Sequence, residues 1–283
     1  MSVIPAVVTP FAPGGGAVDL DALDAHVTWL HDRGIDCIAP LGTNGEGPSL
    51  SLEERKAVIE RLADHPRPLT LLPGTGATSL PETIELSRFA TEHEVAGVLV
   101  APPSFFPAER DGVLRYYAAL LDALPDEARV YLYNVPAYTG VPIEVADVWA
   151  LREAYGERVA GVKDSGGHLE HTVALLAIPG LVVYSGSDAT VAAAFRAGVH
   201  GVVSALANVV PELVMAVASG DEDQARLSRL RDATKAVPQR AALKALVAEV
   251  TGLPRAAVRP PQAELEPDEL DTLIHRFQAP AVT

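Results

Sequence analysis

The sequence holds a single cysteine, Cys37, and few basic side chains: 22 lysines and arginines stand against 37 acidic residues. One cysteine can form no internal disulfide, which fits a reducing cytoplasm, and its apolar surroundings predict an inert core residue. The net charge of −15, without any basic stripe, argues against DNA or another polyanion as a partner. No run of about 18 uncharged apolar residues occurs, so no membrane span is expected. No basic segment precedes the first apolar run, so no secretory signal is expected.

What the chain of 283 residues does have is a regular alternation of short apolar runs and amphipathic segments. The runs, nearly continuous and rich in Val, Leu and Ile, are typical of strands buried on both faces. They lie at 3–11, 34–42, 68–76, 95–103, 129–136, 158–165, 181–188 and 198–206. Eight such strand–helix units over about 220 residues predict an α/β fold, a closed (β/α)₈ TIM barrel. The rival, an open doubly wound sheet, would carry a glycine-rich dinucleotide loop before a helix, which TPFAPGGG does not resemble.

The helices between these strands carry start signals. Ser51 stands three residues before Glu54, which is the spacing of a capping box. Ser79 and Asp188 are expected as N-caps of two further helices.

Beyond about residue 222 the pattern changes to helices alone. Three amphipathic segments follow one another, at 222–237, 239–252 and 266–278. We therefore expect a catalytic barrel over residues 1–222 and a C-terminal helical appendage over residues 223–283.

The stretch RVAGVKDSGG places a lysine, Lys163, at the end of the sixth apolar run. In a parallel barrel, functional side chains gather where strands pass into the following loops. With a period of two, Val159, Gly161 and Lys163 share one face, and Gly161 would leave room beneath the lysine stem. Burial there disfavours the ammonium form and leaves a neutral amine that can attack a carbonyl. The alternative is that Lys163 reaches water or pairs with a carboxylate such as Asp164.

Two other strand ends carry polar groups. In YLYNVP, Tyr133 is expected beside Lys163, about 4.8 Å away across the sheet, where a phenol can move protons. The alternative is a half-buried aromatic with a local hydrogen bond. In PLGTNGEGPSLS, a glycine-rich turn with the side chains of Thr43 and Asn44 is suited to receive a carboxylate, unless it serves geometry alone.

Together these motifs resemble the N-acetylneuraminate lyase / dihydrodipicolinate synthase family of class I, Schiff-base aldolases. The resemblance covers essentially the whole chain, from PAVVTPF through GTNGEGPSLSLEER, YNVPAYTG, GVKDSGG, SGSD and GVVSALANVVPEL to VRPP. It implies an enzyme that acts on pyruvate or another small 2-oxo acid, needs neither a metal nor an organic cofactor, and forms a homotetramer built from dimers.

The resemblance also implies roles for single residues. Lys163 would form the imine with the keto carbon, Tyr133 would bond the adduct and move protons, and Thr43 would relay to Tyr133. A protonated imine accepts electrons, so the C3–C4 bond of the substrate can break. The remaining substrate-binding residues would be Gly42, Asn44, Tyr138, Ser165, Gly186 and Val203.

Three positions depart from the synthase pattern. Tyr138 stands where synthases carry an arginine that grips the carboxylate of aspartate semialdehyde. Ser104 and Phe105 occupy the loop where a tyrosine often reaches a neighbouring subunit. GTN replaces a pair of threonines and, with GPSLS and KDSGG, is closer to the branch that cleaves 2-keto-3-deoxy sugar acids or 4-hydroxy-2-oxoglutarate, in which Ser165 would reach a substrate hydroxyl. We therefore expect a carbon–carbon lyase that releases pyruvate, unless Arg110 or a partner subunit replaces the missing cation and restores synthase activity.

Other functions remain open. A dehydratase of the same family is one. A metal-dependent aldolase would need converging ligands, whereas His168 and His171 are expected on a solvated helix face. A phosphate-binding barrel would not place Asp188 in the loop after the seventh strand, because the carboxylate repels phosphate. A non-catalytic 2-oxo acid sensor would keep the imine and lose the proton relay.

Overall fold

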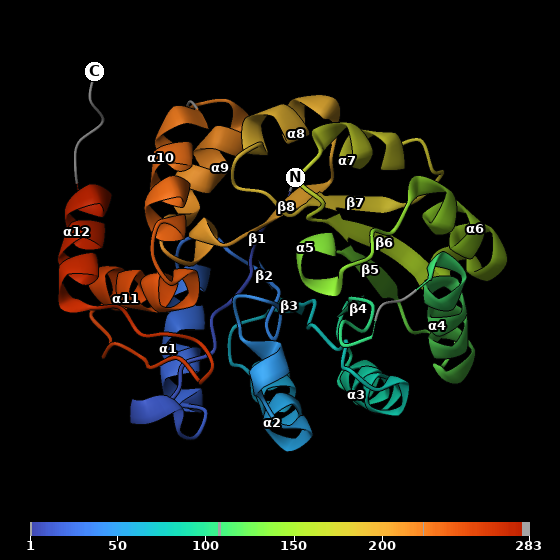
Figure 1. The fold of residues 1–283 in the computed structure, drawn as a ribbon, viewed down its shortest axis with the longest axis horizontal. Coiled ribbons are helices and arrows are strands. Elements are labelled where there is room, and N and C mark those ends of the chain that lie inside the picture. The colour runs from blue at the N-terminus through green and yellow to red at the C-terminus, as the bar shows by residue number, and fades with distance from the viewer. Residues whose placement is uncertain (1, 107–108, 223, 279–283) are drawn as a thin grey trace.

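The computed structural model describes residues 2–106, 109–222 and 224–278 and shows parallel strands surrounded by helices (Figure 1). Six strands pair in the order β1 (Ser2–Pro5), β8 (Gly201–Ser204), β7 (Val182–Ser185), β6 (Val159–Asp164), β5 (Val130–Asn134) and β4 (Val98–Val100). The remaining two, β2 (Cys37–Ile38) and β3 (Thr70–Leu71), pair with each other.

Backbone hydrogen bonds close this set of strands into a ring. Next to β2, the Ala39 N–H donates to the carbonyl of Pro5 in β1, and the Val7 N–H donates back to Ala39. Beyond β3, the Leu99 N–H of β4 donates to the carbonyl of Pro73. The predicted (β/α)₈ barrel is confirmed, and the short paired segments of β2 and β3 explain why the ring appears as two sheets.

Helices follow the strands in turn and pack around the ring. They are α1 (Leu20–His31), α2 (Leu52–Ala63), α3 (Leu80–Glu92), α4 (Arg110–Ala123), α5 (Pro136–Thr139), α6 (Val145–Tyr155), α7 (Leu169–Leu175), α8 (Val191–Ala197) and α9 (Pro211–Ser219). Short 3₁₀ turns lie at Pro13–Gly15, Gly47–Ser49, Gly156–Arg158 and Leu206–Asn208. No helix among the described residues is long and apolar enough to cross a membrane.

Two of the three predicted N-caps are confirmed. Ser51 and Glu54 form both halves of the capping box of α2, and Ser79 accepts a hydrogen bond from the Glu82 N–H at the start of α3. The prediction for Asp188 is wrong, because α8 begins after Thr190. The Asp188 carboxylate instead accepts hydrogen bonds from the Ser204 hydroxyl at the end of β8 and from the N–H groups of Ala205 and Leu206 just after it.

Apolar side chains pack in two layers, one between the strands and the helices and one inside the ring. The inner layer includes Ile4, Ala6, Ala39, Leu72, Leu99, Tyr131 and Val203. Inside it the rings of Tyr131 and Tyr184 stack with centroids 5.6 Å apart. A Cβ on Gly161 would lie 2.6 Å from the Tyr131 ring, so the space predicted beneath Lys163 is filled by this tyrosine.

The predicted alternation along β6 is only partly correct. The register with β5 shifts by one residue, so that Val130 pairs with Val159 but Tyr131 pairs with Gly161. Val159 therefore packs in the outer layer, while Gly161 faces the inner layer. This irregularity restores the expected pairing further along, where Lys163 lies beside Tyr133.

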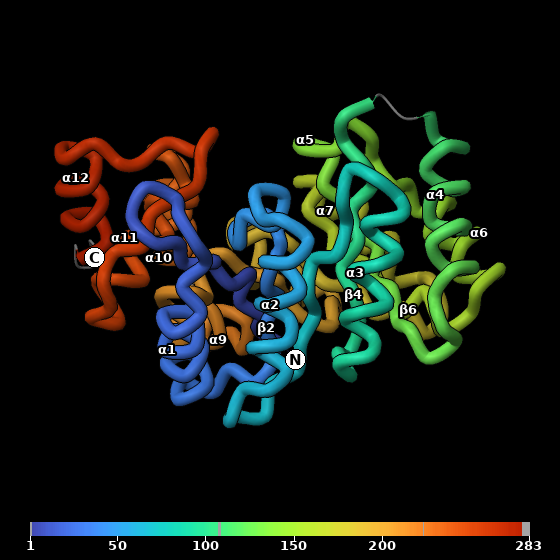
Figure 2. The backbone as a smooth tube through the Cα atoms, turned by 90° about the horizontal axis from the view of Figure 1, so that it is seen from below, coloured from blue at the N-terminus to red at the C-terminus, as the bar shows by residue number. Residues whose placement is uncertain are grey.

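The C-terminal helices are α10 (Gln224–Lys235), α11 (Gln239–Thr251) and α12 (Pro267–Gln278), close to their predicted ranges. They pack as a group beside α9 and α1 (Figures 1 and 2). The boundary expected after residue 222 falls between α9 and α10, next to residue 223, which lies outside the described residues. The division into two domains stays a prediction.

Candidate active site

Lys163 and Tyr133 lie side by side at the carboxyl ends of β6 and β5. The two residues are register partners, and both are buried, with exposed fractions of 4% and 8%. The Lys163 Nζ atom lies 3.9 Å from the centroid of the Tyr133 ring. Among the described residues, no carboxylate lies within ion-pair distance of this amine. The amine is therefore buried against an aromatic face without an acidic partner.

Asp164, the carboxylate next to Lys163 in the sequence, is bound elsewhere. Its side chain accepts hydrogen bonds from Asn134 Nδ2 at 2.7 Å, Thr172 Oγ1 at 2.6 Å and the Gly166 N–H at 3.1 Å. His171 Nδ1 lies 3.0 Å from the same carboxylate. Burial raises the pKa of Asp164, but these hydrogen bonds outweigh it and lower the pKa. The alternative in which Lys163 pairs with Asp164 is therefore wrong.

His171 also corrects the expectation of a solvated histidine pair. It is half-buried against Asp164, whose hydrogen bond raises the pKa of the imidazole, whereas His168 is exposed just before α7. In the part of the chain that the structure describes, no group of three or more His, Cys, Asp and Glu side chains is placed to hold a metal ion.

Tyr133 is connected to the loop after β2. Its hydroxyl lies 3.1 Å from Thr43 Oγ1, which is the relay predicted for these two residues. Burial raises the pKa of Tyr133, but the charge of Lys163 and the polar contacts with Thr43, Lys163 and Ser165 together lower it. A phenol with a lowered pKa gives up its proton more easily, which suits a group that must both accept and donate protons.

The turn after β2 presents unused backbone donors. In the described chain, the N–H groups of Thr43 and Asn44 donate no hydrogen bond, whereas those of Glu46 and Gly47 bond to carbonyls within the turn. Successive free N–H groups attract an anion. The turn is tight: a Cβ on Gly47 would lie 2.0 Å from the Leu41 carbonyl oxygen, so this position requires glycine.

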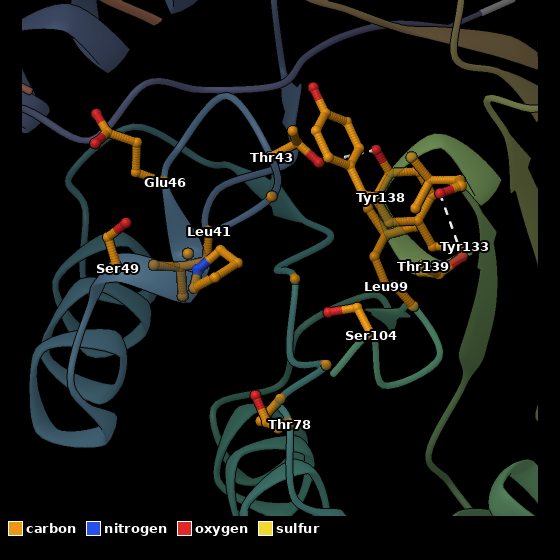
Figure 3. Close-up of a pocket in the computed structure, with 18 of the residues that line it drawn as sticks. Leu41, Thr43, Glu46, Ser49, Thr78, Leu99, Ser104, Tyr133, Tyr138 and Thr139 are labelled. Atoms are coloured by element: carbon orange, nitrogen blue, oxygen red, sulfur yellow. Dashed lines mark hydrogen bonds between the residues drawn. The ribbon is translucent and has the colours of Figure 1, made fainter. Parts of the chain in front are cut away.

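A pocket of about 430 Å³ opens at the carboxyl ends of β2 to β5. Thr43, Tyr133 and Tyr138 gather at one end of it, while Glu46 and Ser49 lie at the other (Figure 3). Gly42 and Ser104 also belong to the lining. Two lining residues, Arg240 and Gln262, come from the C-terminal helical region. That region therefore contributes to the wall of the pocket.

The other predicted residues do not belong to this lining. Ser165 and Gly186 are neighbours, since a Cβ on Gly186 would lie 1.9 Å from Ser165 Oγ. Val203 belongs to the inner apolar layer. Asn44 is half-buried in the β2 turn, and Lys163 reaches the pocket only as the neighbour of Tyr133.

Over residues 1–279 the chain matches the dihydrodipicolinate synthetase family. It belongs to that family. An uncharacterized DapA-like lyase of Chloroflexus aurantiacus is 38% identical over 280 residues, which cover 96% of this chain and 94% of that protein. The solved structure of dihydrodipicolinate synthase from Agrobacterium tumefaciens superposes with a TM-score of 0.91 and 31% identity, covering 98% of each chain. The solved structure of a variant of 2-keto-3-deoxygluconate aldolase from Sulfolobus solfataricus superposes with a TM-score of 0.88 and 26% identity. The match covers 98% of this chain and 94% of that one.

The family resemblance read from the sequence motifs is thus confirmed, and with it the (β/α)₈ barrel. The relatives identify the chain as a lyase of the dihydrodipicolinate synthetase family. Synthases and aldolases both stand among its structural neighbours, so the class of carbon–carbon lyase is supported while the substrate is left open.

A further feature of the site is the cation near Tyr138, the residue that stands where synthases carry an arginine. Arg110, the predicted replacement for the missing synthase arginine, starts α4 and pairs with Asp147 of α6 outside the pocket lining, so that expectation is wrong. The cation that does approach is Arg240, whose Nη2 lies 3.4 Å from the Tyr138 hydroxyl. Arg240 is distant in sequence from every strand end, so no local sequence pattern indicated its place beside Tyr138.

An ion pair that the sequence did not predict fixes another part of the pocket wall. Arg55 is buried, donates to the carbonyls of Gly74 and Gly76, and lies 3.8 Å from Glu82. Burial lowers its pKa to about 10. Each guanidinium bond ties α2 to the loop after β3. The spacing of Arg55 on the buried face of α2, amid apolar residues, is the signal that could have identified it.

Proposed function

We propose that this protein is a pyruvate-dependent class I aldolase that cleaves a 4-hydroxy-2-oxo acid or a 2-keto-3-deoxy sugar acid. The observation that carries the proposal is the buried amine of Lys163, 3.9 Å from the Tyr133 ring and without a carboxylate, beside a tyrosine bonded to Thr43. A lysine amine in this position, beside a phenol that can transfer protons, can add to a substrate carbonyl.

The first step forms the covalent bond to the substrate. The Lys163 amine adds to C2 of the oxo acid, and water leaves with a proton that Tyr133 supplies, which gives a protonated imine. The free N–H groups of Thr43 and Asn44 would hold the adjacent carboxylate. The substrate carbonyl must reach Lys163 past Tyr133, so the phenol stands beside the reacting carbon.

The second step breaks the C3–C4 bond. The hydroxyl on C4 loses its proton to Tyr133, C4 becomes the carbonyl carbon of the departing aldehyde, and the bonding electrons pass to the imine as an enamine. Tyr133 then returns a proton to C3, and water hydrolyses the imine to free pyruvate and Lys163. One phenol thus accepts and donates in turn, a task suited to the lowered pKa of Tyr133.

A second candidate is the synthase reaction, because a synthase is among the structural neighbours. That reaction condenses pyruvate with aspartate semialdehyde. The two activities are compared by kcat/KM on one preparation, with pyruvate release from a 4-hydroxy-2-oxo acid on one side and condensation on the other. We expect cleavage to be faster. Condensation faster by an order of magnitude would replace the aldolase assignment with the synthase one.

The direct test is a pyruvate-release screen over 2-keto-3-deoxygluconate, 4-hydroxy-2-oxoglutarate and N-acetylneuraminate. In parallel, the protein is reduced with borohydride in the presence of pyruvate, which should add one adduct in the peptide that contains Lys163. An adduct without turnover on any acid would indicate a 2-oxo acid sensor. An unmodified Lys163 would exclude the imine mechanism. A homotetramer, implied by the family resemblance, remains a proposal that light scattering can test.

A further inference from the structure

Arg240 projects into the pocket from the first turn of α11. Its Nε donates to the carbonyl of Thr43 at 3.1 Å, Nη1 donates to Gln262 Oε1 at 3.0 Å, and Nη2 approaches the Tyr138 hydroxyl at 3.4 Å. All three acceptors are neutral. They hold the guanidinium in one orientation without cancelling its charge.

The other charged residues of the pocket lining are paired. Arg55 lies 3.8 Å from Glu82, and Glu46 lies 2.5 Å from Lys244. In the described parts of the chain, Arg240 has no carboxylate within 4.0 Å. The wall of the pocket therefore carries one positive charge without a protein counterion.

The position of this charge is unfavourable for the helix that bears it. Arg240 is the second residue of α11, and the amino end of a helix dipole repels cations. A guanidinium has five N–H donors, of which three are used here, so one remains on each terminal nitrogen. The Tyr138 hydroxyl can also donate. These groups together match an anion bound at the end of the pocket.

We propose that Arg240, assisted by Tyr138, binds a carboxylate at the far end of the substrate, so that the preferred acid is a 4-hydroxy-2-oxo diacid. This inference rests on the aldolase function proposed above. Thr43 connects the two ends, because its hydroxyl contacts Tyr133 and its carbonyl contacts Arg240. The planar guanidinium can bind a carboxylate through two parallel N–H···O hydrogen bonds. A phosphoryl group carries nearly two negative charges, and the single unpaired cation of Arg240 would neutralise only one of them.

The test uses two acids that differ only at the far end. The first is 4-hydroxy-2-oxopentanedioate, which yields pyruvate and glyoxylate. The second is 4,5-dihydroxy-2-oxopentanoate, in which a hydroxymethyl group replaces the terminal carboxylate and which yields pyruvate and glycolaldehyde. The unmodified protein should favour the diacid in kcat/KM by at least about tenfold, since hydrogen bonds to charged groups exceed neutral ones.

Arg240→Gln removes the charge while keeping a side chain that can donate to Thr43. We expect cleavage of the diacid to fall by roughly 10- to 100-fold and cleavage of the neutral-ended acid by less than about threefold. Arg240→Lys keeps the charge without the planar guanidinium. Its cleavage of the diacid should therefore lie between that of the unmodified protein and that of Arg240→Gln. Arg226→Gln removes an exposed charge on α10 and should change neither rate. Melting temperatures of all variants show whether each is folded.

Several outcomes would overturn the inference. Equal cleavage of both acids by the unmodified protein would do so, as would an equal loss on both acids in Arg240→Gln, which would show that Arg240 only positions Thr43. In both cases the aldolase function would stand. A strong preference for a phosphorylated sugar acid would replace the carboxylate with a phosphate. Cleavage of no acid would overturn the aldolase function, and this inference with it.

Discussion

Two buried lysines in this protein occupy similar surroundings with one difference. Lys163 and Lys244 have exposed fractions of 4% and 2%, and each Nζ lies over an aromatic ring, that of Tyr133 at 3.9 Å and that of Phe11 at 4.2 Å. Lys244 also lies 2.5 Å from the buried carboxylate of Glu46. Lys163 has no such partner among the described residues. Lys244 is thus part of a buried ion pair, whereas the Lys163 amine lies against a ring without a carboxylate partner.

The function of the Lys244 region follows from its connections. Glu46 also accepts a hydrogen bond from the Arg259 N–H, so the turn after β2 is tied to the C-terminal region twice. Burial lowers the pKa of Lys244, while the hydrogen bond and the charge of Glu46 oppose that shift. This ion pair holds the turn that carries Thr43. The Lys163 region, in contrast, is positioned by the barrel strands themselves.

The largest expected effect on this comparison of the two lysines comes from replacing Lys163. Lys163→Ala removes the nucleophile, and pyruvate release should fall by more than about 10⁴-fold, beyond the usual 10²- to 10⁴-fold of acid–base groups. Steady-state pyruvate release and borohydride trapping measure this loss. Lys235→Ala removes an exposed lysine of α10 and should leave both unchanged. Retained turnover in Lys163→Ala would show that Lys163 is only a buried lysine like Lys244.

Tyr133→Phe tests the other half of the same region. The ring beneath Lys163 remains, but the hydroxyl bonded to Thr43 is lost. Turnover should fall by about 10²- to 10⁴-fold, since acid–base catalysis is typically of that size, while borohydride trapping partly survives. Thr43→Val should give a smaller loss in the same direction. A loss below about threefold in Tyr133→Phe would assign the phenol a packing role.

The sequence predicted the barrel and the Lys163–Tyr133–Thr43 group because strand-end positions and period-two patterns are local signals. It did not predict Arg240 or the Glu46–Lys244 pair, which join segments about 200 residues apart. Nothing in a local pattern says which helix face meets which loop. The cation two residues into α11, against its dipole, was the one available hint. Asp188 was misassigned for the same reason, because its partners lie at the end of the following strand and just after it.

The Lys244 region should respond in stability rather than in chemistry. Lys244→Met leaves the Glu46 carboxylate buried without its partner, and the free energy of unfolding should fall by about 3–5 kcal/mol. Urea unfolding curves measure the change. The double variant Lys244→Met/Glu46→Gln removes both charges and should recover most of that loss. If Lys244→Met proves as stable as the unmodified protein, the contrast between the two lysines is not one of charge pairing.

A third buried base shows that lack of an acidic partner does not by itself make a reactive site. His26 of α1 is fully buried, its Nε2 lies 3.0 Å from the carbonyl of Asn208, and it is not part of the pocket lining. Burial lowers its pKa from 6.5 to about 4, against the opposing hydrogen bond. The imidazole is therefore neutral in the folded protein near pH 7, and it lies outside the pocket lining.

This burial predicts a pH dependence of stability. Between about pH 6.5 and pH 4 the unfolded chain binds a proton at His26 that the folded protein does not, so stability falls as the pH falls through that window. At pH 5 the loss attributable to His26 should be about 2 kcal/mol relative to pH 7. His26→Gln removes the titration, so the difference in unfolding free energy between variant and parent should shift by that amount between the two pH values. A parallel pH dependence in His26→Gln and parent would mean that His26 accepts its proton in the folded state, and burial alone would then not separate it from Lys163.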